Sequence, residues 1–196
     1  CHIDYGFHLI ITDPTPQALG QDLPALVADG YSSVKVFMTY EGMKLTDREI
    51  LETLEAAKAC GALPMVHAEN DDAIEFLRDR AEDRGDVAPK FHASTRPIPA
   101  EREATHRAIA LAEIIDTPVM IVHVSNRDAM EEIRAGRARG SKVYGETCPQ
   151  YLVLTADDLD LKGFDGAKYV CSPPPRDTAS QAACWEGLET GVFDVF

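Results

Sequence analysis

The sequence predicts an α/β protein that forms an incomplete (β/α)₈ barrel. Segments typical of strands alternate with segments typical of helices, and together they make five consecutive βα-type units. The predicted strands at 63–69 and 117–125 are nearly continuous apolar runs, which suit parallel strands buried on both faces. A closed barrel needs about 250 residues. We therefore expect about five of the eight barrel units, with the first and last strands missing.

An open, doubly wound sheet is the alternative arrangement for alternating strands and helices. No GxGxxG or Walker motif follows any predicted strand, which disfavours the nucleotide-binding version of that fold. No domain boundary, internal repeat or low-complexity tract interrupts the chain. Residues 1–196 are therefore expected to form one partial barrel domain.

The first predicted elements are a strand at 5–12, a helical stretch at 15–30 and a strand at 33–40. Pro24 should interrupt the helical stretch, because proline lacks the backbone N–H that a helix interior uses. A strong helix is predicted next, at 45–61. Its start is indicated by a capping box and its end by a glycine, which involve Thr46, Glu49 and Gly61.

The remaining elements repeat the same alternation. Strands are predicted at 63–69, 117–125 and 141–149. Helices are predicted at 71–85, 100–116 and 127–140, and a proline-containing loop precedes the long middle one. Loop signals increase from residue 150 onward. The segment at 171–177, "CSPPPRD", cannot form a regular helix or a central strand, because its three prolines remove backbone donors.

The composition excludes several classes of partner. The 196 residues are 45% hydrophobic and 27% charged, and 19 basic against 33 acidic residues give a formal net charge of −14. This charge argues against nucleic acids and anionic membranes as partners. No apolar run reaches the length of about 18 residues that a membrane span needs. The chain begins without Met, inside a predicted strand and without signal-peptide features, which suggests a fragment.

The cysteine pattern indicates the redox state of the cellular compartment. They are odd in number, scattered and without a CxxC pair, at positions 1, 60, 148, 171 and 184. Such a pattern is typical of a reduced, cytoplasmic protein rather than of a disulfide framework.

Three polar residues lie on strands that should be apolar. Lys35 lies within the strand at 33–40, while His67 and His123 close the runs "PMVH" and "MIVH" just before polar turns. That position is the C-terminal end of a parallel strand, where barrel enzymes carry their active sites. Taken singly, each histidine is equally well explained as a core residue with one backbone hydrogen bond, and the lysine as an edge or snorkelling residue. Three neighbouring strands would nevertheless point the three side chains at one another.

A buried Lys35 needs a physical explanation. Full burial lowers a lysine pKa by about 3–5 units, which corresponds to about 4–7 kcal/mol against the charged form. A domain with a total stability of about 5–15 kcal/mol does not carry that cost uncompensated. Lys35 should therefore be exposed, neutral, paired or chemically modified.

The neighbouring histidines help to choose among these states. A neutral lysine suits a Schiff-base enzyme, whereas two imidazoles suit a divalent metal ion better. An ammonium group is not a metal ligand. A carbamylated lysine removes the conflict, because it is anionic and offers two oxygens that could bridge two metals.

Five motifs extend this interpretation along the chain. They are, in order, "KVFMTY", "VHAEN", "HVS", "GETCPQYL" and "YVCSPPPRD", and the loop "HASTRPIPAEREATHRAI" lies among them. With these motifs the chain resembles the cyclic amidohydrolases, and among them the dihydropyrimidinase and D-hydantoinase branch. The resemblance covers essentially all 196 residues, and the order of the five motifs makes it specific.

The resemblance implies a barrel with two divalent metal ions, usually zinc. It implies that carboxylated Lys35 bridges both metals and that His67 and His123 bind the second one. Tyr40 would be the catalytic tyrosine whose hydroxyl contacts the substrate carbonyl, and the backbone of Ser172 would help to hold the substrate ring. The substrate would be a small cyclic ureide, a hydantoin or a dihydropyrimidine, hydrolysed to an N-carbamoyl amino acid. A homotetramer is the assembly that the resemblance implies.

Tyr40 and Ser172 also have ordinary interpretations. Tyr40 by itself is a strand-end aromatic residue with a solvated hydroxyl, and Ser172 is a turn residue before prolines.

The sequence departs from the family pattern in three respects. None of the six histidines forms the HxH pair that binds the first metal. Asp194 does not match the metal-binding aspartate of the last barrel strand, which acts as general base and acid. The small β-sandwich of the family is absent as well. This chain alone is therefore expected to lack ligands and to be inactive.

Three other functions remain open. A non-catalytic scaffold related to dihydropyrimidinase would lack the metal ligands, whereas all three are present here. An allantoinase or a dihydroorotase would share the same centre. A Schiff-base aldolase would use Lys35 as its nucleophile.

Overall fold

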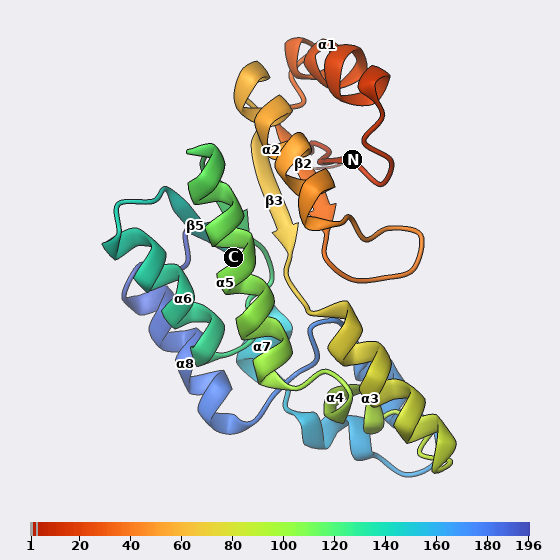
Figure 1. Cartoon of the computed structure of the whole chain (residues 1–196). Helices are drawn as coiled ribbons and strands as arrows, with labels where there is room; N and C mark the ends of the chain where they lie inside the picture. Colours follow the sequence, from red (N-terminus) through yellow and green to blue (C-terminus); the bar gives the residue numbers. More distant parts are fainter. Residues whose placement is uncertain (1, 3) are drawn as a thin grey trace.

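Five parallel strands form a sheet in which the order in space follows the order in the sequence (Figure 1). The structure is a computed structural model that describes residues 2 and 4–196. The strands are β1 (Leu9–Ile10), β2 (Ser33–Phe37), β3 (Leu63–His67), β4 (Val119–Ile121) and β5 (Val143–Gly145). Four free cysteines are described, and Cys1 lies outside the described residues.

Helices follow the strands and pack on one another in chain order. The α-helices are α1 (Leu23–Ala28), α2 (Asp47–Cys60), α3 (Asp71–Asp83), α4 (Phe91–Ser94), α5 (Ile98–Ile115), α6 (Arg127–Ala138), α7 (Pro149–Val153) and α8 (Thr178–Glu189). Shorter turns of π- and 3₁₀-helix are η1 (Ala18–Asp22), η2 (Ala156–Asp160) and η3 (Asp165–Tyr169).

The helices identify the sheet as part of a barrel. Helix α1 contacts α2, α2 contacts α5, α5 contacts α6 and α6 contacts α8, so these helices form a continuous layer (Figure 1). A doubly wound sheet instead carries helices on both faces and reverses its strand order. Sequential parallel strands under one helical layer are the arrangement of a (β/α)₈ barrel, to which this chain contributes five strands. The predicted fold class is confirmed.

The two faces of the sheet bury different side chains. Val34 and Val36 on β2 are fully buried, and Val36 belongs to the main core between the sheet and the helices. Because side chains alternate along a strand, Lys35 and Phe37 face the other side, which is the barrel interior. A smaller cluster that includes Met65 lies on a face separate from the main core. Lys35 thus lies on the inner face, as the sequence predicts.

The prediction for the N-terminal segment is partly wrong. Of the strand expected at 5–12, two residues pair with β2. The helix is not broken at Pro24, because η1 runs directly into α1. In the π-helical turn, the N–H of Leu23 bonds to the carbonyl of Ala18, five residues back. The backbone thus stays helical, with π-type hydrogen bonding, up to the residue before Pro24, and the proline lies in the first turn of α1, where its missing N–H is tolerated.

Helix α2 confirms its predicted boundaries. The Thr46 side chain accepts a hydrogen bond from the Glu49 N–H, and the Glu49 carboxylate accepts one from the Thr46 N–H. Gly61 ends the helix with a φ of 79°. Helix α8, by contrast, lies in the part of the chain expected to be rich in loops. Its small residues, such as Ala183 and Cys184, pack against the main core without an amphipathic pattern that sequence alone could show.

The C-terminal end of the sheet faces a helical lobe. Helices α3 and α4 lie beyond the tip of β3, and η2 and η3 lie beside them (Figure 1). The segment at 171–177 crosses this region without regular structure, as predicted. Beyond β5, Val195 forms a parallel bridge with Glu146, so pairing has begun where the next barrel strand would lie. Among the described residues, no helix is both long and apolar enough to cross a membrane.

Candidate metal centre

The two predicted histidines meet at the C-terminal ends of β3 and β4. His67 is the last residue of β3 and pairs in register with Phe37 of β2. His123 follows β4 by two residues. The two imidazole rings lie 4.5 Å apart between centroids, at an angle of 68°. The structure therefore brings His67 and His123 together, as the strand-end rule predicts.

Lys35 adds its amine to this cluster from β2. Burial lowers the pKa of Lys35 to about 8, although the nearby Glu146 and Cys148 act in the opposite direction. The Nζ atom lies 5.2 Å from the ring centroid of Phe37, whose ring stacks on that of His67. The charge of Lys35 is also close enough to lower the pKa of His123. The half-buried lysine therefore lies near the two imidazoles.

His123 is held in an unusual conformation with a free ring nitrogen. Its φ is +45°, and its backbone N–H donates to the Glu146 carboxylate over 3.2 Å. Burial, and then the charges of His67 and Lys35, lower the pKa of His123 well below its usual value. Its Nδ1 is buried and has no hydrogen-bond partner among the described residues. The ring is therefore neutral, and one of its nitrogens is available to a ligand.

His67 is oriented by a buried carboxylate. Its Nε2 lies 2.7 Å from Oε2 of Glu69, and both side chains are almost completely buried. An ionised carboxylate can only accept a hydrogen bond, so Nε2 carries the proton of a neutral His67 ring. Nδ1 then has a free lone pair. Carboxylate–histidine pairs of this kind orient metal-binding histidines in many proteins.

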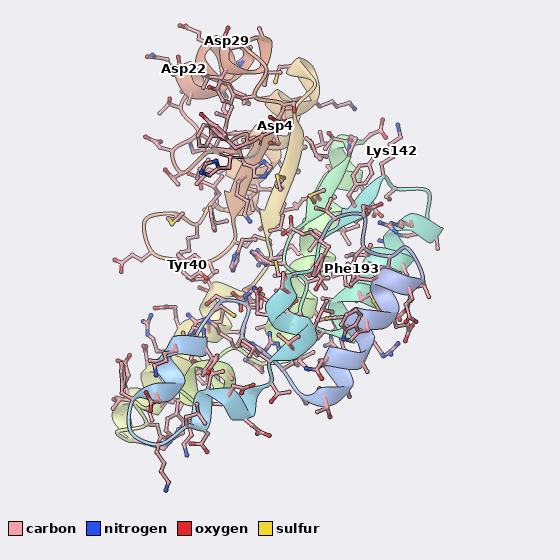
Figure 2. The ribbon with its side chains drawn as sticks, turned by 180° about the vertical axis from the view of Figure 1, so that it is seen from behind. Asp4, Asp22, Asp29, Tyr40, Lys142 and Phe193 are labelled. Carbon is pink, nitrogen blue, oxygen red and sulfur yellow. The ribbon has the colours of Figure 1, made fainter. Side chains whose placement is uncertain are left out.

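Tyr40 lies at the junction between the sheet and the helical lobe (Figure 2). Its ring centroid is 5.0 Å from that of His67. Burial raises the pKa of the Tyr40 hydroxyl, while a hydrogen bond with Ser172 acts in the opposite direction. The hydroxyl is therefore protonated at neutral pH and can donate a hydrogen bond. The structure places the predicted residues Tyr40 and Ser172 together.

His92 fixes the segment that carries Ser172. Its Nε2 lies 2.8 Å from the carbonyl oxygen of Cys171 and 3.1 Å from Oγ of Ser172. Its Nδ1 lies 3.2 Å from an Arg96 guanidinium nitrogen. The guanidinium can only donate, so Nδ1 accepts and Nε2–H donates toward the segment that contains Ser172. Burial and the charge of Arg96 lower the pKa of His92, which favours this neutral form.

A buried ion pair joins the segments behind the site. Arg176 and Glu101 approach to 2.8 Å, with side chains that are 5% and 3% exposed. The Glu101 carboxylate also accepts hydrogen bonds from the backbone N–H of Ser125 and the side-chain amide of Asn126. Arg176 donates further to the Ser125 hydroxyl and to the carbonyl of Arg96. The pair therefore links the turn after His123 to the segment that contains Ser172.

Known proteins with high similarity to the chain are hydantoinases and dihydropyrimidinases. The D-hydantoinase of Rhizobium radiobacter is 47% identical over 98% of this chain and 42% of the relative. The crystal structure of dihydropyrimidinase from Brevibacillus agri superimposes with a TM-score of 0.95 at 45% identity, over 98% of this chain and 42% of that one. Over nearly its whole length, the chain is therefore similar to D-hydantoinases and to dihydropyrimidinase. It spans about 42% of the length of these relatives.

A more distant solved structure supports the fold of the chain but not its function. A dihydroorotase from Campylobacter jejuni has a TM-score of 0.62 at 15% identity, over 89% of this chain and 45% of that one. No protein-family model matches the chain. The predicted resemblance to the hydantoinase and dihydropyrimidinase branch is confirmed by the closer relatives.

The donor atoms fit the metal centre of a hydantoinase in part. Two adjacent imidazoles are present, and the buried Nδ1 of His123 lacks a partner among the described residues. In the same part of the chain, no group of three or more His, Cys, Asp or Glu side chains could hold a metal ion. A set of three ligands from these residues would therefore have to include another residue type, and Lys35 is the candidate beside the two histidines.

Sequence reasoning missed several side chains of this hydantoinase-like site. One of them, Glu146, follows β5 immediately, at the same strand-end position as the histidines, so the same rule could have found it. Glu69 is two residues after His67, the strand period that places both on one face. His92 and Asp71 carried no such signal, because their partners lie far away in the sequence.

Proposed function

We propose that this chain forms the lysine-containing part of the metal centre in an enzyme that opens hydantoin or dihydropyrimidine rings. The reaction is hydrolysis of the cyclic amide bond to an N-carbamoyl amino acid. One observation supports this most strongly: the half-buried Lys35 of β2, whose pKa is lowered to about 8, lies near two adjacent imidazoles at the ends of the next two strands. The activity is the one for which the relatives are named, and the chain covers about 42% of their length.

In this proposal, Lys35, His67 and His123 hold the metal ions. The resemblance suggests two ions, usually zinc, bridged by Lys35 in its carboxylated form. Bound ions of this kind polarise a carbonyl group and make water a better nucleophile at neutral pH. Glu69 supports the arrangement, because its hydrogen bond to Nε2 of His67 leaves Nδ1 free to bind.

The environment of Lys35 favours its carboxylation. The neutral amine would form a bond to the carbon of CO₂ and release one proton, which yields a carbamate with one negative charge. Only the neutral amine reacts in this way. With a pKa of about 8, Lys35 has a far larger neutral fraction at neutral pH than an exposed lysine. A carbamate would also replace a positive charge beside two imidazoles with a negative one.

Tyr40 is proposed to donate a hydrogen bond to the substrate carbonyl. A protonated hydroxyl can donate to the carbonyl oxygen as negative charge develops there, and burial keeps Tyr40 protonated. The Ser172 side chain lies close enough to the Tyr40 hydroxyl to act on its pKa. Loss of one such donor costs about 2.7–4 kcal/mol in comparable sites. Ser172 would in addition help to hold the ring through its backbone.

The substitution Tyr40→Phe tests the role of Tyr40. It is made in the full-length protein, by which we mean a chain that contains these 196 residues and is as long as the relatives. We expect kcat for hydantoin or dihydrouracil to fall by about 10²–10³-fold, because a transition-state donor is lost. Steady-state kinetics would measure this. Tyr31→Phe is the matched control, since Tyr31 is partly exposed just before β2. Unchanged kcat in Tyr40→Phe would exclude the proposed role.

The proton shuttle is not supplied by Asp194. Its carboxylate lies 2.6 Å from the Arg137 guanidinium and accepts the N–H of Gly145, in a pair on the outer side of β5. The family aspartate on the last barrel strand would have to come from another segment. We therefore expect the 196 residues alone to be inactive. Zinc, a homotetramer and a cytoplasmic location are proposed from the resemblance and the composition.

A further inference from the structure

Tyr40 has a backbone conformation that needs support. Its φ is +82°, a left-handed value that costs a non-glycine residue about 1–3 kcal/mol. The residue lies in the loop between β2 and α2, where the N–H groups of Met43 and Lys44 bond to its carbonyl oxygen. These bonds close the turn after Tyr40. These bonds do not hold the backbone N–H of Tyr40 or the residue before it.

The carboxylate of Asp71 provides that support from a different element. Asp71 is the first residue of α3, and its side chain is 9% exposed. Its Oδ1 accepts a hydrogen bond from the backbone N–H of Tyr40 over 3.1 Å and from the hydroxyl of Thr39 over 2.8 Å. Its Oδ2 pairs with the amine of Lys44. One carboxylate thus holds both sides of the turn that carries Tyr40.

We propose that Asp71 is a positioning residue for catalysis, which holds the Tyr40 hydroxyl in place against the substrate carbonyl. The inference rests on the proposed function of Tyr40. Charge-assisted hydrogen bonds are about twice as strong as neutral ones, so Asp71 can offset the cost of the left-handed φ. Without them the turn relaxes and the hydroxyl moves.

Asp71 also has an ordinary structural role from which this function must be separated. An acidic residue in the first turn of a helix interacts favourably with the helix dipole. The next residue, Asp72, is exposed and lies in the same turn of α3. It has no hydrogen bond to the Tyr40 turn. Asp72→Ala is therefore a control that removes the same charge from the same helix end.

The test measures kcat and KM of the full-length protein for one cyclic substrate. Asp71→Ala should lower kcat by about 10- to 100-fold, since a displacement of about 1 Å in a catalytic group can cost that much. KM should change little, because the Tyr40 hydroxyl acts mainly in the transition state. Asp71→Asn keeps an oxygen acceptor for Thr39 and Tyr40 but loses the charge, so it should recover part of the loss. Asp72→Ala should match the unchanged protein.

A double-mutant cycle with Tyr40→Phe tests whether Asp71 acts through the Tyr40 hydroxyl. If Asp71 acts through Tyr40, Asp71→Ala should have little further effect on kcat when the hydroxyl is already gone. Equal losses in both backgrounds would overturn the proposal, because Asp71 would then act independently of the hydroxyl. An unchanged kcat in Asp71→Ala would overturn it as well. If Tyr40→Phe itself were harmless, the proposed role of Tyr40 would fail, and that outcome is visible in the single variant.

Discussion

Lys35→Ala in the full-length protein is expected to remove most of the bound metal and to abolish measurable turnover. Loss of an outer-shell partner alone costs about 10–100-fold in metal affinity or activity, and Lys35 is proposed as a direct ligand. His67 and His123 would remain as ligands without the proposed anionic ligand from Lys35. Metal content by elemental analysis and kcat by steady-state kinetics measure the two effects.

Lys142→Ala is the matched control. Lys142 is exposed just before β5, and Figure 2 shows it at the end of the sheet far from Tyr40. Small carboxylic acids should partly restore metal binding to Lys35→Ala, since they supply the charge and oxygens of a carbamate. Normal metal content in Lys35→Ala would contradict the proposed ligand. Trapping of a carbonyl substrate on Lys35 by borohydride would instead favour the Schiff-base alternative.

Arg176→Met is expected to give the largest loss of stability. It leaves the buried Glu101 carboxylate without its cation, and breaking a buried pair in this way costs about 3–5 kcal/mol. The hydrogen bonds from Arg176 to Ser125 and to the Arg96 carbonyl are lost as well. Chemical denaturation of the full-length protein measures the change in the free energy of unfolding.

An exposed pair supplies the comparison for Arg176. Arg127 lies 2.6 Å from Glu186, with side chains 48% and 38% exposed, so Arg127→Met should cost at most about 1 kcal/mol. The double variant Arg176→Met with Glu101→Gln should recover part of the loss, because it removes the unpaired buried charge. Equal costs for Arg176→Met and Arg127→Met would show that the buried pair does not hold the site together.

The sequence was sufficient to predict the barrel and the residues at its strand ends. Lys35, His67 and His123 stand out because each interrupts or closes an apolar run, and parallel strands bring such positions together. The clear boundaries of α2 follow from local capping chemistry. The role of Lys35 as a bridging ligand came from family resemblance, since no spacing rule distinguishes a carboxylated lysine from a free one.

Other features depend on contacts that local patterns do not encode. Asp71 meets Thr39 across 32 residues, and Arg176 meets Glu101 across 75. The left-handed conformation of Tyr40 follows from such contacts and not from the preference of tyrosine. At Pro24 the local rule failed, because a π-helical turn precedes the proline and places it in the first turn of α1, where no N–H is needed.

The central claim is that Lys35, His67 and His123 bind metal together. An anomalous-scattering map from crystals of the full-length protein would test it most directly. We expect metal peaks within bonding distance of His67 and His123, and density for a carboxylate attached to Nζ of Lys35 that reaches the same peaks. Metal bound elsewhere, or an unmodified Lys35 amine pointing into solvent, would contradict the claim.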